Sequence, residues 1–251
     1  MEQNIQIQPL ISIITVCFNS EKTIRQTIES VLNQTYTNIE YILVDGESTD
    51  STVTIIEEYA PLFAERGIQY RWVSEPDEGI YDAINKGIKL SSGDWINVQG
   101  SDDWLELNAC DTVNLYGANV DVLYGFTRMI MNGICLRIGQ NMHDNLEQET
   151  INHQSIFMKK YIHNEIGVYS LDYLLASDYE FLLRAKNAGY IFKNIEVVNS
   201  NYSLCGYSGS NYVLSTEENA RVRFNHGIIT RKELFVIRLK LKLRKLLKIM
   251  Y

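Results

Sequence analysis

Apolar and polar residues follow each other in two kinds of block along the first hundred residues. Short runs of Val, Ile and Leu have the length of strands buried on both faces, and longer blocks repeat their apolar positions with helical spacing. Ile24, Ile28 and Val31, for example, lie at i, i+4 and i+7. The pattern predicts strands over residues 10–17, 39–44, 69–74 and 95–99. Helices are predicted between them, over 24–32, from an N-cap at Ser48 to about Tyr59, and over 80–90. This alternation predicts an α/β fold with a doubly wound, mostly parallel sheet between two layers of helices.

The pattern changes after residue 104. It predicts a helix over 105–116, a strand over 121–126, a hairpin of 127–131 and 134–138 around Asn132-Gly133, a loop over 139–155, a helix over 178–188 and a strand over 191–198. We find no linker and no repeat. The sequence therefore predicts one domain over residues 1–230, with a nucleotide-binding half (8–104) and an irregular half (105–214), followed by a tail (231–251).

Polar side chains gather where the predicted strands end. Phe18-Asn19, Asp45-Gly46, Ser74-Glu75-Pro76-Asp77 and Ser101-Asp102-Asp103 follow the four strands in turn. Ligands of open parallel sheets bind outside these carboxyl ends, so the residues predict a polar pocket. Adjacent carboxylates such as Asp102 and Asp103 repel each other unless a cation lies beside them, and Mg²⁺ or Mn²⁺ would supply that charge together with phosphate oxygens. A turn with two solvated aspartates is the alternative.

Composition and charge narrow the class of protein. The chain has 251 residues and a net charge of −8, but residues 231–251 carry +7 and the rest −15. The acidic body argues against nucleic acid as the principal partner.

No apolar run approaches the roughly 18 residues that span a bilayer, and the N-terminus lacks the basic region of a secretory signal. Four scattered cysteines without metal spacing are interpreted as buried thiols in a reducing compartment. A cytoplasmic location is expected.

The basic tail predicts an amphipathic helix. Leu239, Leu243, Leu246, Leu247 and Met250 share one face, opposite Lys240, Arg244, Lys245 and Lys248, whereas Leu241 falls off the apolar stripe. Such a helix is attracted to the interface of anionic membranes, which favours a peripheral location on the inner face of the cytoplasmic membrane. A helix packed on the domain, or a disordered end, is the alternative.

Several ordered motifs resemble the family 2 inverting glycosyltransferases with the GT-A fold. They are residues 12–16 with Asn19, 30–36, 44–50 and 74–87, followed by Gly93-Asp94 and Asp102-Asp103-Trp104. The resemblance is continuous over residues 10–104 and thinner to about residue 210. The most similar members build bacterial O-antigen, capsule or exopolysaccharide units. The resemblance therefore implies a nucleotide-sugar donor and a glycan or lipid-linked saccharide acceptor.

The resemblance also implies roles for residues of the first half. Phe18 lies where the family places a residue against the nucleotide base, Asp45 matches the acid at the base edge, and Asp102 matches the acid near the ribose. Asp103 matches the ligand of a divalent metal ion, Mn²⁺ or Mg²⁺, that bridges the diphosphate. Three further residues match the helix edge that faces the phosphates and the donor sugar, namely Asp82, Asn85 and Lys86. Without the motif, Lys86 is an ordinary surface lysine.

Inverting transfer needs a carboxylate base in the second half. Residues 176–184 resemble the family segment that holds it, with Asp178 as the base and Glu180, about 200° around the helix, as the fallback. Ser177 replaces the acid of the commoner Glu-Asp pair, and Asp178 as a simple helix cap is the alternative. His153 is a candidate contact to phosphate or acceptor, or else a structural histidine. Ser208 lies in a stretch similar to the family's flexible loop over the diphosphate.

Taken together, the sequence predicts a metal-dependent inverting glycosyltransferase that transfers a hexose, with UDP as the expected nucleotide. Two alternatives stay open. A sugar nucleotidyltransferase needs a glycine-rich basic loop after the first strand, and Cys17-Phe18-Asn19-Ser20-Glu21 contains no glycine. The absence of a G-x-G-x-x-G motif there also argues against a dehydrogenase. The other alternative is a non-catalytic module that binds nucleotide sugars, in which Asp103 and Asp178 would be dispensable.

Overall fold

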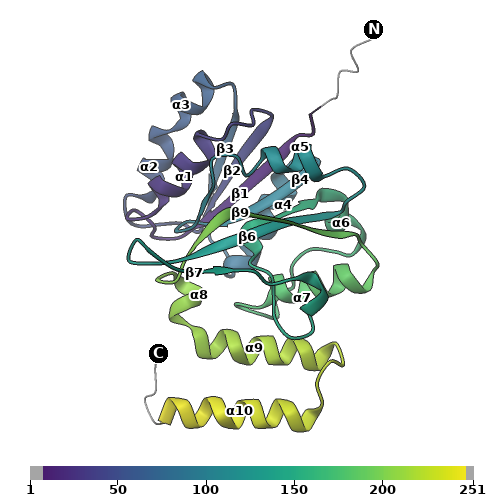
Figure 1. Ribbon diagram of the computed structural model, residues 1–251. Helices are drawn as coiled ribbons and strands as arrows, with labels where there is room; N and C mark the ends of the chain where they lie inside the picture. The colour runs from purple at the N-terminus through teal and green to yellow at the C-terminus, as the bar shows by residue number, and fades with distance from the viewer. Residues whose placement is uncertain (1–7, 247–251) are drawn as a thin grey trace.

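The first half of the chain forms the parallel part of the sheet. In the computed structural model, which describes residues 8–246, four strands pair side by side in the order β3-β2-β1-β4 and all run parallel (Figure 1). Their bounds and those of the helices between them are β1 (Ile11–Cys17), α1 (Ile24–Leu32), β2 (Ile39–Asp45), α2 (Thr52–Glu58), α3 (Ala60–Glu65), β3 (Gln69–Ser74), α4 (Ile80–Leu90) and β4 (Trp95–Gly100). The predicted alternation of strand and helix is confirmed here.

The single helix predicted from an N-cap at Ser48 to about Tyr59 is wrong in two respects. The helix begins only at Thr52, because the backbone N–H of Ser48 donates to Asp45 and that of Thr49 donates to Asn19. The helix beyond then divides into α2 and α3 around Tyr59, with a proline in the first turn of α3. Proline is tolerated in a first turn, where its missing N–H has no helical partner, and it marks a new start.

The second half continues the same sheet with mixed directions. Its elements are β5 (Trp104–Leu105), α5 (Asp111–Tyr116), β6 (Val122–Met131), β7 (Ile134–Gly139), β8 (Ile156–Lys159), α6 (Lys160–Glu165), α7 (Ser177–Asn187) and β9 (Phe192–Ser203), with short 3₁₀ turns η1 (His143–Asn145) and η2 (His153–Ser155). Beyond β4 the order is β8-β6-β9-β5, and β7 pairs with β6. Within residues 8–246 this makes one sheet of nine strands, in which β6 and β9 are parallel and the other new pairs are antiparallel.

Differences from the predicted bounds in this half come from pairing across long sequence distances. Residues 104–105 pair with β9 rather than beginning the predicted helix, so α5 begins only at Asp111. The predicted strand and the first hairpin arm are one long strand, β6, since β9 follows it through two register shifts. The predicted hairpin at Asn132-Gly133 is confirmed, and both residues have the positive φ that such turns require.

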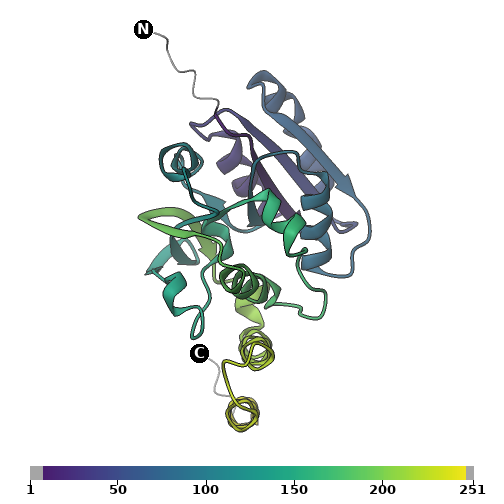
Figure 2. The same cartoon turned by 90° about the vertical axis from the view of Figure 1, so that its right-hand side faces the viewer.

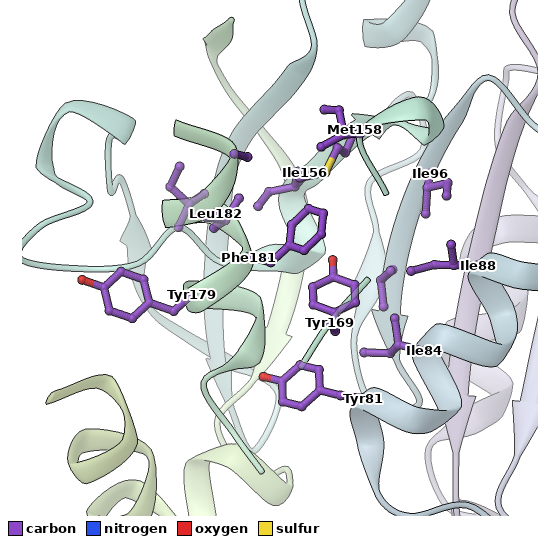
Figure 3. Packing of buried hydrophobic residues seen from close by; sticks show 14 of the residues in the cluster. Tyr81, Ile84, Ile88, Ile96, Ile156, Met158, Tyr169, Tyr179, Phe181 and Leu182 are labelled. Carbon is purple, nitrogen blue, oxygen red and sulfur yellow. The ribbon is translucent and has the colours of Figure 1, made fainter. Parts of the chain in front are cut away.

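Two hydrophobic cores lie on opposite faces of the sheet. Alternate residues of β1 divide between them, with Ile14 facing α4 and α7, and Ile11 and Ile13 facing α1. The first core includes residues from both halves of the chain, and Figure 3 shows the ring of Tyr169 between Tyr81 of α4 and Phe181 of α7. The halves are therefore joined by a shared core as well as by the sheet.

Three helices follow the sheet, α8 (Tyr207–Ser210), α9 (Tyr212–Asn225) and α10 (Arg231–Leu246). Figure 2 shows α9 and α10 nearly end-on, one beneath the other. No helix within residues 8–246 is long and apolar enough to cross a membrane. The prediction of four buried thiols holds for Cys17 and Cys110 and is wrong for Cys135 and Cys205, which are exposed at the β6–β7 hairpin and after β9.

Candidate active site

A cavity of about 230 Å³ with polar and apolar lining residues opens where β1 and β4 end and where the second half of the chain folds against them. The first half contributes the end of β4, the loop beyond it and the first turn of α4. The second half contributes η2, the first turn of α7 and the segment from β9 to α9. The polar and aromatic side chains that line it include Tyr81, Asp102, Asp103, Asn152, His153, Gln154, Asp178, Tyr202, Tyr207, Ser208 and Asn219.

Asp102 and Asp103 lie on one side of this cavity. The Asp103 side chain is buried and accepts hydrogen bonds from the side-chain amide of Gln154 at 2.7 Å and from the backbone N–H of Ser203 at 2.8 Å. Burial, followed by the charge of Asp102, raises the pKa of Asp103. Burial also raises the pKa of Asp102. Two adjacent acids are thus held in a place that penalises their negative charge.

This pair suits a divalent cation that is shared with a diphosphate. Mg²⁺ in proteins commonly takes one or two carboxylates and completes its coordination with water and substrate phosphates. Across residues 8–246 no cluster of three or more His, Cys, Asp or Glu side chains is arranged to hold a metal ion. Asp102 and Asp103 therefore fit a metal only together with a ligand that brings further oxygens.

Asp178 lies in the first turn of α7 and borders the same cavity. One carboxylate oxygen, Oδ1, accepts a hydrogen bond from the phenol of Tyr81 at 2.7 Å, and the other, Oδ2, lies 3.4 Å from Nδ1 of His153. Burial alone would raise the pKa of Asp178, but the contacts of His153 and Tyr81 outweigh it and lower that pKa. The site thus contains an ionised, partly buried carboxylate, which is the state a general base requires.

A close backbone contact lies beside Asp102. Gly206, at the start of α8, is so near that a Cβ atom there would lie 2.1 Å from the Asp102 carboxylate oxygen. Only glycine fits this approach without a shift of either group. Ser208, the predicted loop residue, lies two positions further along and lines the cavity.

Phe18 and Asp45 lie at the ends of β1 and β2, outside the set of residues that lines the cavity. Phe18 is 61% exposed, as a residue that stacks on a ligand ring would be. Asp45 is fully buried, and its carboxylate accepts hydrogen bonds from Ser48 and Ser74. The backbone beside it is close to Asp77, because a Cβ atom on Gly46 would lie 2.5 Å from that carboxylate. The predicted roles of Phe18 and Asp45 stay predictions.

Asp82, Asn85 and Lys86 lie on a face of α4 that is turned away from this cavity. Lys86 is 3.2 Å from both Glu75 and Asp82. Asn85 makes two hydrogen bonds with the backbone of Tyr169, at 2.9 and 3.0 Å. All three border a separate open hollow of about 530 Å³. The structure therefore shows their structural contacts, and their predicted roles toward the donor remain untested.

Glu180, the fallback base, points away from the cavity. The single Nε–H of Arg184 donates a bifurcated hydrogen bond to both of its carboxylate oxygens, each 2.9 Å away, and the carboxylate lies 3.7 Å from His226. Asp178 and Glu180 are two residues apart on a helix, so they face nearly opposite directions. The geometry favours Asp178.

Two residues of the site had no role in the sequence prediction. Tyr81 stands in the stretch Ile80-Tyr81-Asp82-Ala83, but its contact to Asp178 spans 97 positions and no local pattern indicates it. Gln154 follows His153 directly and contacts Asp103. Its position next to the candidate His153 was the only available signal.

Comparisons with known proteins point to one family. The glycosyl transferase family 2 model matches residues 12–162. A PGL/p-HBAD biosynthesis glycosyltransferase of Mycobacterium bovis is 32% identical over 207 residues, which cover 79% of this chain and 78% of the relative.

Solved structures agree in fold. S. aureus TarS in complex with UDP-GlcNAc matches 85% of this chain and 66% of its own, with a TM-score of 0.65 and 19% identity. The mannosyltransferase PcManGT of Pyrobaculum calidifontis, in complex with GDP-Man and Mn²⁺, matches 89% of this chain and 65% of its own, with a TM-score of 0.68 and 15% identity. This chain thus spans about two thirds of either structure. With the family match over more than half of its length, the chain belongs to the family 2 glycosyltransferases and has the GT-A fold.

Proposed function

We propose that this glycosyltransferase moves a hexose from a nucleotide sugar to a glycan or lipid-linked saccharide with inversion at the anomeric carbon, and that Asp178 is its base. One observation carries the proposal. The carboxylate of Asp178 borders the same cavity as the acidic pair Asp102 and Asp103, and its lowered pKa favours the form that can accept a proton. A base and a diphosphate site across one cavity are the two parts that a direct displacement needs.

The proposed reaction is a single displacement. The acceptor hydroxyl oxygen forms a bond to the anomeric carbon while its proton passes to the Asp178 carboxylate. The bond from that carbon to the diphosphate oxygen breaks, and its electron pair leaves with the nucleoside diphosphate. A base on one face of the sugar and the leaving group on the other give inversion.

We assign the pair Asp102 and Asp103 to a divalent cation, Mn²⁺ or Mg²⁺. When bound, such a cation neutralises the negative charge that develops on the departing diphosphate. Gln154 and the backbone of Ser203 hold the Asp103 carboxylate in one orientation. The Mn²⁺ in the structure of the GDP-Man-bound neighbour supports this assignment.

We further propose UDP as the nucleotide, with a role in surface polysaccharide assembly. The UDP-GlcNAc complex of a structural neighbour supports a UDP-linked donor, and the GDP-Man complex keeps a second nucleotide open to test. Membership of the glycosyltransferase family favours transfer over the two alternatives from the sequence, a sugar nucleotidyltransferase and a non-catalytic binding module.

The C-terminal helix supports a membrane partner. Leu234 and Leu241 of α10 are buried and mark the side that packs on α9, while a stripe of four apolar residues on another side stays exposed, namely Phe235, Val236, Leu239 and Leu243. These four lie within about 100° of the helix circumference. Exposed basic residues surround the stripe, namely Arg231, Lys232, Lys240 and Lys242. We propose that this face rests on the anionic inner surface of the cytoplasmic membrane.

The expected stripe is thereby partly revised. Leu239 and Leu243 share an exposed face as predicted, and Leu241, placed off that stripe, is buried. Residues 247, 248 and 250 of the predicted pattern lie outside the described residues, as do the side chains of 245 and 246.

The central test uses the Asp178→Asn variant. A panel of UDP-, GDP- and dTDP-sugars is first screened for metal-dependent hydrolysis, in which water replaces the acceptor. With the best donor, Asp178→Asn is expected to bind the nucleotide sugar normally in calorimetry while its turnover falls by about 10² to 10⁴, the usual contribution of a general base.

Glu180→Gln is the matched control, since the same change is made two positions away on the same helix. It is expected to keep most of the activity. Normal turnover by Asp178→Asn would show that the base lies elsewhere. Binding of nucleotide sugars without turnover by the wild-type protein under all conditions would favour the non-catalytic module.

A further inference from the structure

A hydrogen bond joins the two halves of the chain at the candidate base. The phenol of Tyr81, in the first turn of α4, donates to Asp178 in the first turn of α7. Tyr81 is 6% exposed, and its ring stacks on that of Tyr169 with 5.7 Å between centroids. Figure 3 shows these two rings in line with Phe181, between α4 and α7. Packing therefore fixes the direction of the Tyr81 phenol.

His153 approaches the same carboxylate from a third segment. Its Nδ1 lies 3.4 Å from Asp178, and its neighbour in η2, Gln154, donates to Asp103. The turn η2 therefore contacts both the candidate base and the acidic pair. Main-chain displacement of this turn would disturb both sides of the cavity at once.

The two contacts leave room for a substrate hydroxyl. An ionised carboxylate offers about four lone-pair sites. Tyr81 contacts one oxygen and His153 lies beside the other, while the side chain keeps 16% of its surface exposed and borders the cavity. Both oxygens of the Asp178 carboxylate therefore have a neighbour that fixes them, and the carboxylate is still accessible from the cavity.

Electrostatics agree with this geometry. Burial, and then the charge of Asp178, raise the pKa of Tyr81 well above its ordinary value, so the phenol keeps its proton and remains a donor. Burial lowers the pKa of His153, but contact with Asp178 and the nearby charge of Asp103 outweigh it and raise that pKa. The titratable groups around Asp178 are thus Tyr81 from α4, His153 from η2, Tyr169 before α7 and Tyr202 from β9, and the charge of Asp103 after β4 acts on His153.

We propose that Tyr81 and His153 are positioning residues of the transfer reaction, which hold the two oxygens of the Asp178 carboxylate so that it is aimed at the acceptor hydroxyl. The proposal rests on the proposed function of Asp178 as the base. It assigns to Tyr81, from the nucleotide-binding half, a role in the chemistry of the other half. Neither residue exchanges a proton in the step, because the proton of the acceptor hydroxyl ends on Asp178.

The Tyr81→Phe variant tests the proposal, because it removes one hydroxyl and keeps the stacked ring. The assay is hydrolysis of the nucleotide sugar that the wild-type enzyme hydrolyses fastest in the presence of Mn²⁺. We expect kcat to fall about tenfold and the acid limb of the kcat–pH profile to move up by about one unit, as for loss of a hydrogen bond to a charged group. KM for the donor is expected to stay unchanged.

Tyr169→Phe is the matched control. It removes the same hydroxyl from the neighbouring ring of the stack, and no hydrogen bond from that hydroxyl to Asp178 is present within residues 8–246. It is expected to leave kcat and the pH profile unchanged. Equal effects of Tyr81→Phe and Tyr169→Phe, or an unshifted acid limb in Tyr81→Phe, would overturn the assignment of Tyr81.

His153 is tested by a pair of variants. His153→Asn keeps an N–H donor near the position of Nδ1, and His153→Leu removes it. We expect the Asn variant to keep a higher kcat than the Leu variant and to keep the acid limb of its kcat–pH profile at a lower pH. The thermal stability of the two variants is expected to be equal. Identical profiles for both would show that the imidazole does not act on Asp178. Asp178→Asn is assayed alongside, so that failure of the positioning proposal can be distinguished from failure of the proposed function. Normal activity of Asp178→Asn would show that Asp178 is not the base.

Discussion

The surroundings of two acids of the site shift their pKa values in opposite directions. Asp178 receives donors from Tyr81 and His153, which lower its pKa despite burial. Asp103 faces Asp102, and burial and that charge raise its pKa although Gln154 donates to it. Environments that push the pKa values of nearby acids apart are a mark of catalytic sites. This contrast distinguishes the two carboxylates. That of Asp178 is available to accept a proton, whereas the unfavourable charge of Asp103 would be offset by a bound cation.

Asp103→Asn is expected to stabilise the metal-free protein while weakening its function. The folded-state pKa of Asp103 is raised above the unfolded value, so stability falls as pH rises from about 4 through that raised pKa. The asparagine amide of the variant does not ionise, so the variant does not lose this stability as the pH rises. We expect the melting temperature of the metal-free variant to exceed that of the wild type by more at pH 8 than at pH 5.

The same variant is expected to lose the additional thermal stabilisation that UDP and Mn²⁺ together give the wild type. Asp121→Asn, at the start of β6, is a control outside the cavity. An unchanged response to UDP and Mn²⁺ in Asp103→Asn, or unchanged activity of chelator-treated wild type, would exclude the metal role.

The sequence predicted the residues of the site whose position alone is informative. Asp102, Asp103 and Asp178 follow a strand or open a helix, and the structure brings them to one cavity. Tyr81 escaped prediction because its partner is distant in sequence and a tyrosine in an amphipathic helix is ordinary core. The family resemblance assigned Asn85 to the donor site, and that role stays a prediction. The structure adds that the Asn85 amide bonds the backbone of Tyr169 as both donor and acceptor, a contact that the sequence could not indicate because the two residues are 84 positions apart.

At the scale of elements, the first half was predicted well because each strand and helix has its own periodic pattern. The α4 helix has the predicted bounds, with Tyr81, Ile84 and Ile88 buried at i, i+3 and i+7. The second half was predicted less well. Short strands such as β5 and β8 exist only because they pair with β9, β4 and β6, and two to four residues carry no pattern of their own.

The α10 helix offers a prediction at this scale. Replacing Leu239 and Leu243 together by Glu removes apolar surface from its exposed stripe and adds negative charge. We expect co-sedimentation with phosphatidylglycerol-rich vesicles to be largely lost, because burial of apolar area and attraction to anionic lipid both contribute to interfacial binding. Binding of the wild type to pure phosphatidylcholine vesicles is expected to be weaker, because those vesicles lack the anionic charge.

Leu107→Glu with Leu115→Glu provides the matched control, since both leucines are at least 60% exposed and lie near α5, away from α10. This control is expected to bind vesicles like the wild type. Absence of the wild-type protein from the vesicle pellet would contradict the membrane proposal. Equal loss in both double variants would show that added charge, rather than the α10 face, decides binding.

At the scale of the whole molecule, the two halves depend on each other. One sheet within residues 8–246 runs from β3 to β5, and the core around Ile14 includes α4 from one half and α7 from the other. We therefore expect residues 1–230 to unfold as one cooperative unit in urea, with coincident transitions by tryptophan fluorescence and circular dichroism. The three tryptophans all lie within residues 72–104 and so report on the first half.

A fragment of residues 8–104 is the matched test. It contains the four parallel strands β1 to β4. It lacks β8, which pairs with β4, and α7, which shares a core with α4. We expect it to lack a cooperative transition. Two separated transitions in the longer chain, or a stably folded fragment, would divide the single predicted domain.

The alternation of strands and helices was enough to predict the parallel half and its ligand-binding edge. It was not enough to predict that β6 and β9 continue the sheet in parallel with antiparallel neighbours. Those pairings join residues many positions apart, and the hydrophobic pattern does not specify the partner of a strand.

The absence of a side chain at Gly206 determines how near the start of α8 can come to the acidic pair. A Cβ atom there would lie 2.1 Å from the Asp102 carboxylate oxygen, so any larger residue would push Asp102 and the segment between β9 and α9 apart. We therefore expect Gly206→Ala to widen this side of the cavity and to weaken the binding of a nucleotide sugar, as measured by calorimetry, while the sheet and its two cores stay intact.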